Sequence, residues 1–152
     1  MEYRRRILVA AATASAVMLS AILLSPFISP SGSFLFDGGT PGMIDGWWKG
    51  HGIAGIPYAV GDVFCHQELA RSFVLNGSQL PVCMRDTGIV AGAFLGFALC
   101  ALSGRVSYPP SFALAGAIMM AVMVAEWAFE TGGSDIPVLR TASGACAGVG
   151  EP

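Results

Sequence analysis

Residues 7–28 read ILVAAATASAVMLSAILLSPFI, and this stretch decides the class of fold because no charged residue interrupts it. A transmembrane helix needs about 20 mostly apolar residues, each adding about 1.5 Å to its length. Two more stretches, 87–104 and 106–125, also lack charged residues. The sequence therefore predicts an all-α membrane protein with about three transmembrane helices, at residues 7–28, 87–104 and 111–130.

The composition of the whole chain agrees with a lipid environment. Hydrophobic residues make up 54% of the 152 residues and charged residues 12%, which is about half the usual charged fraction of roughly 25%. A net charge of −2 excludes a general nucleic-acid binder, which needs a basic surface. Four cysteines are too few for a scaffold built from disulfides. We therefore expect residues 1–152 to form a single integral membrane domain, with the lipid bilayer as its main partner.

The basic residues near the ends of the spans predict the orientation. Arg4, Arg5 and Arg6 precede the first span, and Arg105 lies between the second and third. Because basic residues favour the cytoplasmic side, the amino terminus should be cytoplasmic and the loop 29–86 exterior. A cleaved signal peptide is the alternative for the first span, but its apolar stretch is longer than the usual 7–15 residues. The predicted location is the cell membrane, as a multi-pass protein.

Two shorter apolar segments complete the expected fold. Residues 51–64 (HGIAGIPYAVGDVF) are too few to cross a bilayer and contain three glycines and a proline. They predict an interfacial or re-entrant helix, with Trp47 and Trp48 at the level of the lipid headgroups. If this segment does cross, everything after it changes side. The tail, 136–150, is rich in small residues and predicts a short C-terminal half-helix or the start of a fourth span.

Small residues mark a packing face on the second span. Gly88, Gly92 and Gly96 recur every four residues, the spacing of a glycine zipper. Small side chains let two helix backbones approach closely in lipid. The face could pack the second span on the third, join two copies in a homodimer, or dock into a larger membrane complex. Cys100 follows the same spacing and is interpreted as a small packing residue.

A group of motifs before and within the second span carries a family resemblance. These motifs are CHQ at 65–67, RSF at 71–73, PVCMR at 81–85 and TGIVAG at 87–92. They resemble the uncharacterised prokaryotic membrane proteins grouped as domain of unknown function twenty eighty-five. The match covers about residues 62–96, and the tail adds a weaker one at Leu139, Arg140, Ser143 and Gly144. This family has no established activity, so the resemblance implies a membrane location and a cysteine–histidine site, but no reaction.

Carried over residue by residue, the resemblance implies a site made of Cys65, His66, Cys83 and Asp86. Asp86 stands where the family usually has the second cysteine of C-x-R-C. Zinc accepts thiolate, imidazole and carboxylate ligands together, whereas copper(I) favours soft sulfur ligands. Cys83 and Asp86 are three residues apart, so one helical turn can direct both to one ion. Cys65 and His66 are adjacent and diverge on a helix, so at least one of them should have another role.

Charged residues elsewhere in the chain could extend this site. Glu126 and Glu130 lie near the end of the third span, where acidic residues at membrane depth are costly and often functional. If the second and third spans are antiparallel, these carboxylates approach the start of the second span. The candidates for an additional shell are Glu126, Glu130, Arg71, Arg85 and Arg140. Simpler interpretations also stay open, namely that the acids are solvated at the interface and that Arg71 and Arg85 pair with nearby carboxylates.

The sequence leaves two functions open. The first is a small membrane protein with an exterior metal site, with zinc as the candidate ion. The second is a redox or disulfide-clasped subunit of a larger complex, in which Cys65 and Cys83 close a loop and Asp86 serves only as a helix N-cap. An enzyme is less favoured, because the adjacent Cys65 and His66 cannot easily turn toward each other as a catalytic pair.

Overall fold

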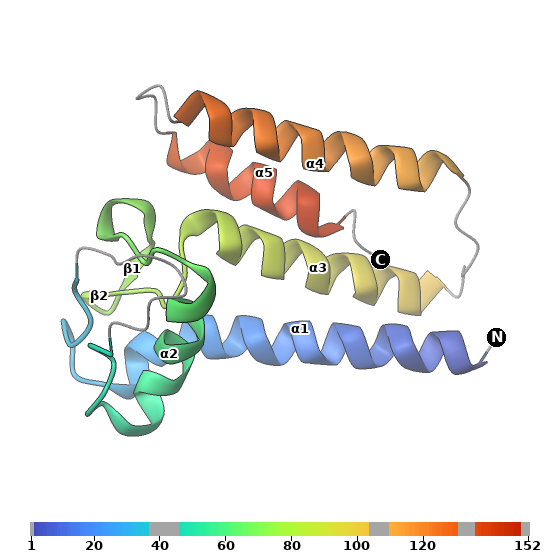
Figure 1. Ribbon diagram of the computed structural model, residues 1–152. Coiled ribbons are helices and arrows are strands. Elements are labelled where there is room, and N and C mark those ends of the chain that lie inside the picture. Colours follow the sequence, from blue (N-terminus) through green and yellow to red (C-terminus); the bar gives the residue numbers. More distant parts are fainter. Residues whose placement is uncertain (1, 37–45, 104–109, 131–135, 150–152) are drawn as a thin grey trace. The chain divides into compact units, whose positions relative to one another are not determined.

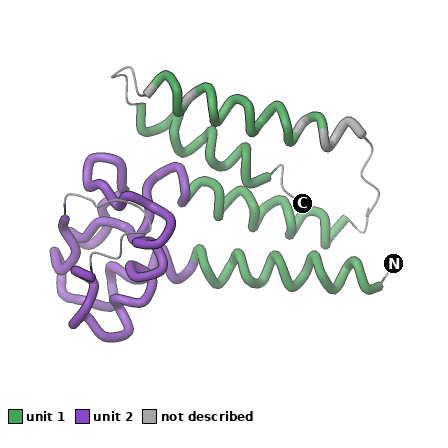
Figure 2. The backbone as a smooth tube through the Cα atoms, viewed as in Figure 1, with its two compact units in different colours: residues 1–19, 87–152 green, residues 20–86 purple. Residues whose placement is uncertain are grey.

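The computed structural model describes residues 2–36, 46–103, 110–130 and 136–149 (Figure 1). Within these ranges the chain is mostly helical, with five α-helices, two short 3-10 helices and one two-stranded hairpin. It divides into two compact units: residues 1–19 together with 87–152, and residues 20–86 (Figure 2). We refer to them as the helical unit and the 20–86 unit.

Two described helices are long and apolar enough to cross a membrane. They are α1, Glu2–Ile28, and α3, Met84–Ser103. The end of α1 is where the sequence predicted it, with Pro26 in its last turn. In contrast, α3 begins three residues before the predicted start of the second span. The prediction is thus confirmed for a mostly helical chain with two helices that could span a membrane.

The other two helices of the helical unit also fall where the sequence predicted helix. The helix α4, Pro110–Glu130, contains the predicted third span, and its segment Gly116–Phe129 is apolar. The helix α5, Pro137–Val149, corresponds to the predicted C-terminal half-helix. It packs against α4. Whether α4 crosses the membrane stays a prediction.

The glycines of α3 lie against α5. A Cβ atom added at Gly88 would overlap the carbonyl oxygen of Thr141, and one added at Gly92 would overlap that of Ala145. From the other side, a Cβ at Gly148 would overlap the carbonyl oxygen of Ile89. Backbones that approach this closely leave room only for hydrogen at those positions. The sequence left open packing on the third span, a homodimer or docking into a larger complex, but at Gly88 and Gly92 the tail helix α5 occupies this face.

The 20–86 unit contains short elements between the end of α1 and the start of α3. They are the 3-10 helices at Gly52–Ala54 and Leu69–Arg71, the helix α2 at Gly55–Phe64, and the strands β1 at Val74–Leu75 and β2 at Ser78–Gln79. The strands are antiparallel, with Val74 opposite Gln79. This hairpin corrects the all-α prediction. Its signal was Asn76-Gly77, because both residues have positive φ (49° and 69°), as a tight hairpin turn requires.

An aromatic core holds the 20–86 unit together. Phe34 and Tyr58 are almost fully buried, and their rings stack with centroids 3.8 Å apart. Ala54 completes the buried cluster, and other aromatic residues pack around it: Phe36, Trp47 and Trp48. The strand β2 joins this core because the Gln79 amide donates to the Phe34 carbonyl at 2.8 Å. This bond pairs the segment around Phe34 with the hairpin that leads toward α3.

Candidate metal centre

Cys65 is placed by the end of α2. The helix stops at Phe64, and Cys65 has an extended backbone (φ −127°, ψ 144°) while its amide still donates to the Gly61 carbonyl at 2.8 Å. The Cys65 side chain is buried. The extended backbone directs the thiol away from the course of the helix, toward the segment that precedes α3.

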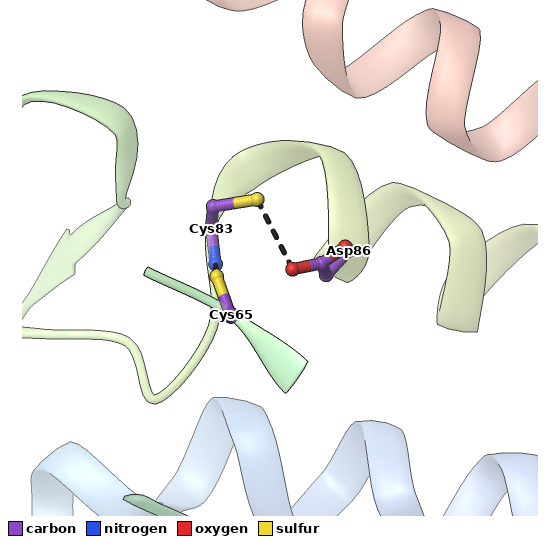
Figure 3. A group of neighbouring side chains, drawn as sticks. All are labelled: Cys65, Cys83 and Asp86. Atoms are coloured by element: carbon purple, nitrogen blue, oxygen red, sulfur yellow. Dashed lines mark hydrogen bonds between the residues drawn. The ribbon is translucent and has the colours of Figure 1, made fainter. Parts of the chain in front are cut away.

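Cys83 and Asp86 are placed by the first turn of α3. Cys83 immediately precedes the helix and Asp86 is its third residue, so the two side chains meet one turn apart, with Cys83 Sγ 3.2 Å from Asp86 Oδ2 (Figure 3). The Cys83 amide donates to Cys65 Sγ at 3.2 Å. The alternative role of Asp86 as the helix N-cap is therefore wrong, because α3 begins at Met84 and the capping position belongs to Cys83.

The three side chains form a compact set of ligand atoms. One sulfur each from Cys65 and Cys83 and one carboxylate oxygen of Asp86 all lie within 4.8 Å of one another. No disulfide joins the described cysteines, so both sulfurs are thiols. In a tetrahedral zinc site with bonds of about 2.3 Å, two sulfur ligands are about 3.8 Å apart. Small side-chain movements would therefore bring these atoms onto one ion.

The two thiols affect each other's ionisation. A hydrogen bond from the Cys65 thiol is the main cause that lowers the pKa of Cys83, and the Asp86 backbone amide lowers it further. Burial and the Asp86 carboxylate act in the opposite direction. The same hydrogen bond, followed by burial, strongly raises the pKa of Cys65. Cys83 therefore ionises first, and its thiolate accepts a hydrogen bond from the Cys65 thiol, whereas a protonated Cys83 donates to Asp86.

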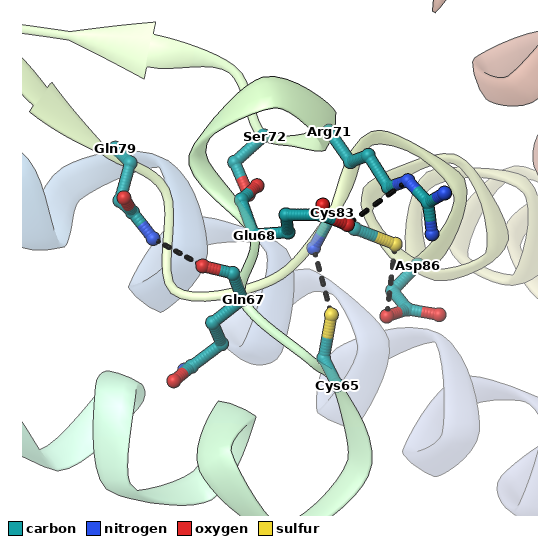
Figure 4. Close-up of polar contacts among 8 residues, drawn as sticks. All are labelled: Cys65, Gln67, Glu68, Arg71, Ser72, Gln79, Cys83 and Asp86. Atoms are coloured by element: carbon teal, nitrogen blue, oxygen red, sulfur yellow. Dashed lines mark hydrogen bonds and ion pairs between the residues drawn. The ribbon is translucent and has the colours of Figure 1, made fainter. Parts of the chain in front are cut away.

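Gln67 holds the two halves of the site together, a role that the sequence analysis missed; Figure 4 shows its position beside Cys65 and the bond that it accepts from Gln79. Its fully buried side-chain amide donates to the Tyr58 carbonyl at 2.9 Å and to the Pro81 carbonyl at 2.6 Å. Gln79 adds a bond from its side-chain amide to the Gln67 carbonyl at 2.7 Å. Because Pro81 lies two residues before Cys83, these bonds hold the Cys83 segment beside α2.

The backbone at Gln67 is itself unusual. Its φ of 51° lies in the left-handed region, which costs a non-glycine residue roughly 1–2 kcal/mol. The hydrogen bonds that the buried side-chain amide of Gln67 donates offset this cost. The sequence did contain a signal for this role. Gln67 belongs to the CHQ motif, and because it is not a metal ligand, its presence there indicates a different function. Its amide instead has two donors suited to binding backbone carbonyls.

The other predicted residues of the 20–86 unit lie outside this group. His66 is exposed and is not among the ligand atoms that come together. Arg71 Nε pairs with Glu68 Oε2 at 3.0 Å, which confirms the simpler interpretation for this arginine. Arg85 is the second residue of α3.

The remaining predicted residues belong to the helical unit. Arg140 is almost fully buried in α5. The side chains of Glu126 and Glu130 lie outside the described part of the structure, although both residues belong to α4. Their place in an additional shell stays a prediction.

Comparison with known proteins identifies a family whose model covers more than half of the chain. Residues 65–151 match the family model described as Predicted membrane protein (DUF2085). The matched segment begins at Cys65 and contains all three residues of the candidate site. No curated protein and no solved structure matched the chain.

Proposed function

Because this chain belongs to the DUF2085 family of predicted membrane proteins, we propose that it binds a zinc ion through Cys65, Cys83 and Asp86. One observation carries the proposal: two thiols and a carboxylate, from segments 18 residues apart, converge to within 4.8 Å. His66 is left out of the proposed ligand set because its side chain is exposed.

The donor set suits zinc better than other common ions. Zinc binds thiolate and carboxylate ligands with tetrahedral geometry, whereas calcium and magnesium prefer oxygen ligands alone. Two thiolates and one carboxylate supply three negative charges, which satisfy a divalent ion. The hydrogen bond between Cys65 and Cys83 prepares Cys83 to lose its proton, as a thiol must before it binds metal. Three protein ligands leave a fourth position for water or for another ligand.

Zinc content should depend on the three proposed ligands and on no other cysteine. Full-length protein purified in detergent is expected to contain about one zinc per chain by elemental analysis. Cys65→Ser and Cys83→Ser should each lose it, because the lost thiolate removes a ligand and its charge. Asp86→Cys should bind zinc at least as tightly, since it restores the usual pattern of the family. Cys100→Ser and Cys146→Ser are matched controls that should keep the wild-type zinc content, and so should His66→Ala.

A different outcome would support the alternative function. Wild-type protein without zinc, in which free-thiol counting finds Cys65 bonded to Cys83, would contradict the metal site. These residues would then form a disulfide clasp in a non-catalytic or redox subunit. The short distance between the two sulfurs favours this as the second candidate.

The proposed function includes an orientation. We place the amino terminus in the cytoplasm and the metal centre at the exterior face, with α1, α3 and α4 as spans. The 3-10 helix Gly52–Ala54 and α2 then stay on the exterior side without crossing, because together they are too short to span.

Thiol labelling of intact cells should reveal this orientation. After mild reduction and chelation, a membrane-impermeant maleimide is expected to label Cys83, which precedes α3. It should not label Cys100, which lies 17 residues further along the same helix. If Cys83 reacts only after the cells are permeabilised, the orientation is reversed.

A further inference from the structure

Exposed apolar side chains lie along one face of the 3-10 helix Gly52–Ala54 and of α2. They are Ile53, Ile56, Val60, Val63 and Phe64. Their spacing of three or four residues places them on one side of a helix, while Tyr58 faces the core on the other side. Ile53 is 76% exposed and Phe64 is 74% exposed. A continuous apolar surface of this kind indicates a binding partner. We call it the α2 apolar face.

The α2 apolar face borders a groove of about 370 Å³ that is lined by Trp48, Gly55 and Phe64, among other residues. Gly55 lies against the backbone of Trp48, where an added Cβ atom would approach the Trp48 carbonyl oxygen closely. The one charged residue of α2, Asp62, is buried and accepts a hydrogen bond from Trp48 Nε1 at 2.9 Å. The face itself therefore carries no charge.

The contact between α2 and α1 indicates the depth of this face in a membrane. The Tyr58 hydroxyl, which donates to the Gln79 carbonyl at 2.6 Å, lies next to Ser25, a fully buried residue near the end of α1. The apolar part of α1 begins at Ile7, directly after three arginines. At about 1.5 Å per residue, Ser25 lies about 27 Å beyond Ile7, close to the thickness of the hydrocarbon core of about 30 Å. Tyr58 therefore lies near the exterior boundary of the hydrocarbon.

Two neighbouring residues are of the types that prefer this boundary. Trp48 lines the groove, and Lys49 Nζ lies 5.7 Å from the centre of the Trp48 ring. Tryptophan is enriched at the level of the lipid headgroups, and a lysine beside it can interact with phosphates. The depth of α2, its uncharged face and this aromatic and basic pair all point to the same occupant.

We propose that the α2 apolar face lies in the exterior boundary of the bilayer and binds phospholipid acyl chains, with Trp48 and Lys49 at the headgroups. The 20–86 unit is covalently joined to a span-length helix at each end, so it stays at the bilayer surface. At this depth the apolar side chains contact lipid in place of water. Burial of apolar area in this way is the main contribution that holds interfacial helices in place. This inference is independent of whether zinc binds.

Photo-crosslinking can identify the occupant directly. A benzophenone amino acid replaces Phe64 or, in a second variant, Ile56, both of them exposed residues of the face. The full-length variants are placed in vesicles of phosphatidylcholine and phosphatidylglycerol, irradiated, and analysed by intact mass spectrometry. Ala70 is the matched control position, because it is exposed beside the ion pair of Glu68 and Arg71. A thermal unfolding midpoint equal to that of the wild type shows that each variant has folded.

We expect a phospholipid adduct at Phe64 and Ile56 and none at Ala70. A crosslinked product with twice the mass of the chain would show that a second copy covers the face, and this would overturn the proposal. It would also be overturned by the absence of any adduct at both apolar positions, which would mean that the face is in water. Equal lipid adducts at Phe64 and Ala70 would show that the contact is not specific to this face, and this result would also overturn the proposal.

Discussion

Replacing Gly61 with valine is expected to unfold the 20–86 unit and to abolish zinc binding together with it. A Cβ atom at this position would overlap the carbonyl oxygen of Pro81 and the side-chain amide of Gln67. Overpacking a buried site costs about 1–3 kcal/mol. The two hydrogen bonds that Gln67 donates would be lost as well, at about 1 kcal/mol each. Their sum is a large part of the stability of a typical domain, about 5–15 kcal/mol.

The matched control for Gly61→Val is Gly52→Ala. Gly52 has a φ of 56° but no neighbouring atom within 4 Å of an added Cβ. Alanine there should cost only the backbone strain, roughly 1–2 kcal/mol. The measurement is the midpoint of thermal unfolding in detergent, followed by near-ultraviolet circular dichroism of the buried aromatic residues. A Gly61→Val midpoint equal to that of wild type would contradict the close packing of α2 against Pro81.

Replacing Gly92 with leucine is expected to separate α5 from α3. The new side chain would begin inside the space of the Ala145 backbone, and a helix backbone cannot move aside as a flexible side chain can. We expect a loss of at least about 1–3 kcal/mol, the usual cost of overpacking. It is measured as a lower concentration of dodecyl sulfate at which the detergent-solubilised protein unfolds.

Ala14→Leu is the control for Gly92→Leu. It adds side-chain volume at an exposed position of α1 and should leave the unfolding midpoint unchanged. If Gly92→Leu also leaves stability unchanged, the contact between α3 and α5 is not formed in the membrane protein. A variant that changes only its oligomeric size would instead indicate that the glycine face joins two copies.

The helices could be predicted from the sequence because hydrophobic length is a local property. Residues 7–28 and the short tail 136–150 contain enough apolar or small residues to define α1 and α5 without any tertiary contact. The close pair of Cys83 and Asp86 could be predicted for the same reason, since a spacing of three residues brings side chains together on any helix. The hairpin had a local signal as well, Asn76-Gly77, which the analysis of apolar stretches did not include.

The rest of the site depends on contacts between distant segments. Cys65 lies 18 residues before Cys83, and contacts between distant segments, such as the bond from Gln67 to the Pro81 carbonyl, bring the two sulfurs together. His66 is adjacent to Cys65, but the extended backbone after α2 leaves its side chain exposed. The sequence could state that one of the two has a different role, but it could not state which one.

The sequence by itself determined that this chain is a helical membrane protein of the DUF2085 family, because apolar length and motif spacing do not depend on the fold. Tertiary structure alone decided which helix covers the glycines of α3 and that Cys65, not His66, accompanies Cys83 and Asp86. Both depend on where backbones approach closely, at Gly92 against Ala145 and at Gly61 against Pro81. A glycine in the sequence shows that such an approach is sterically allowed, but the partner is selected by contacts across the folded chain.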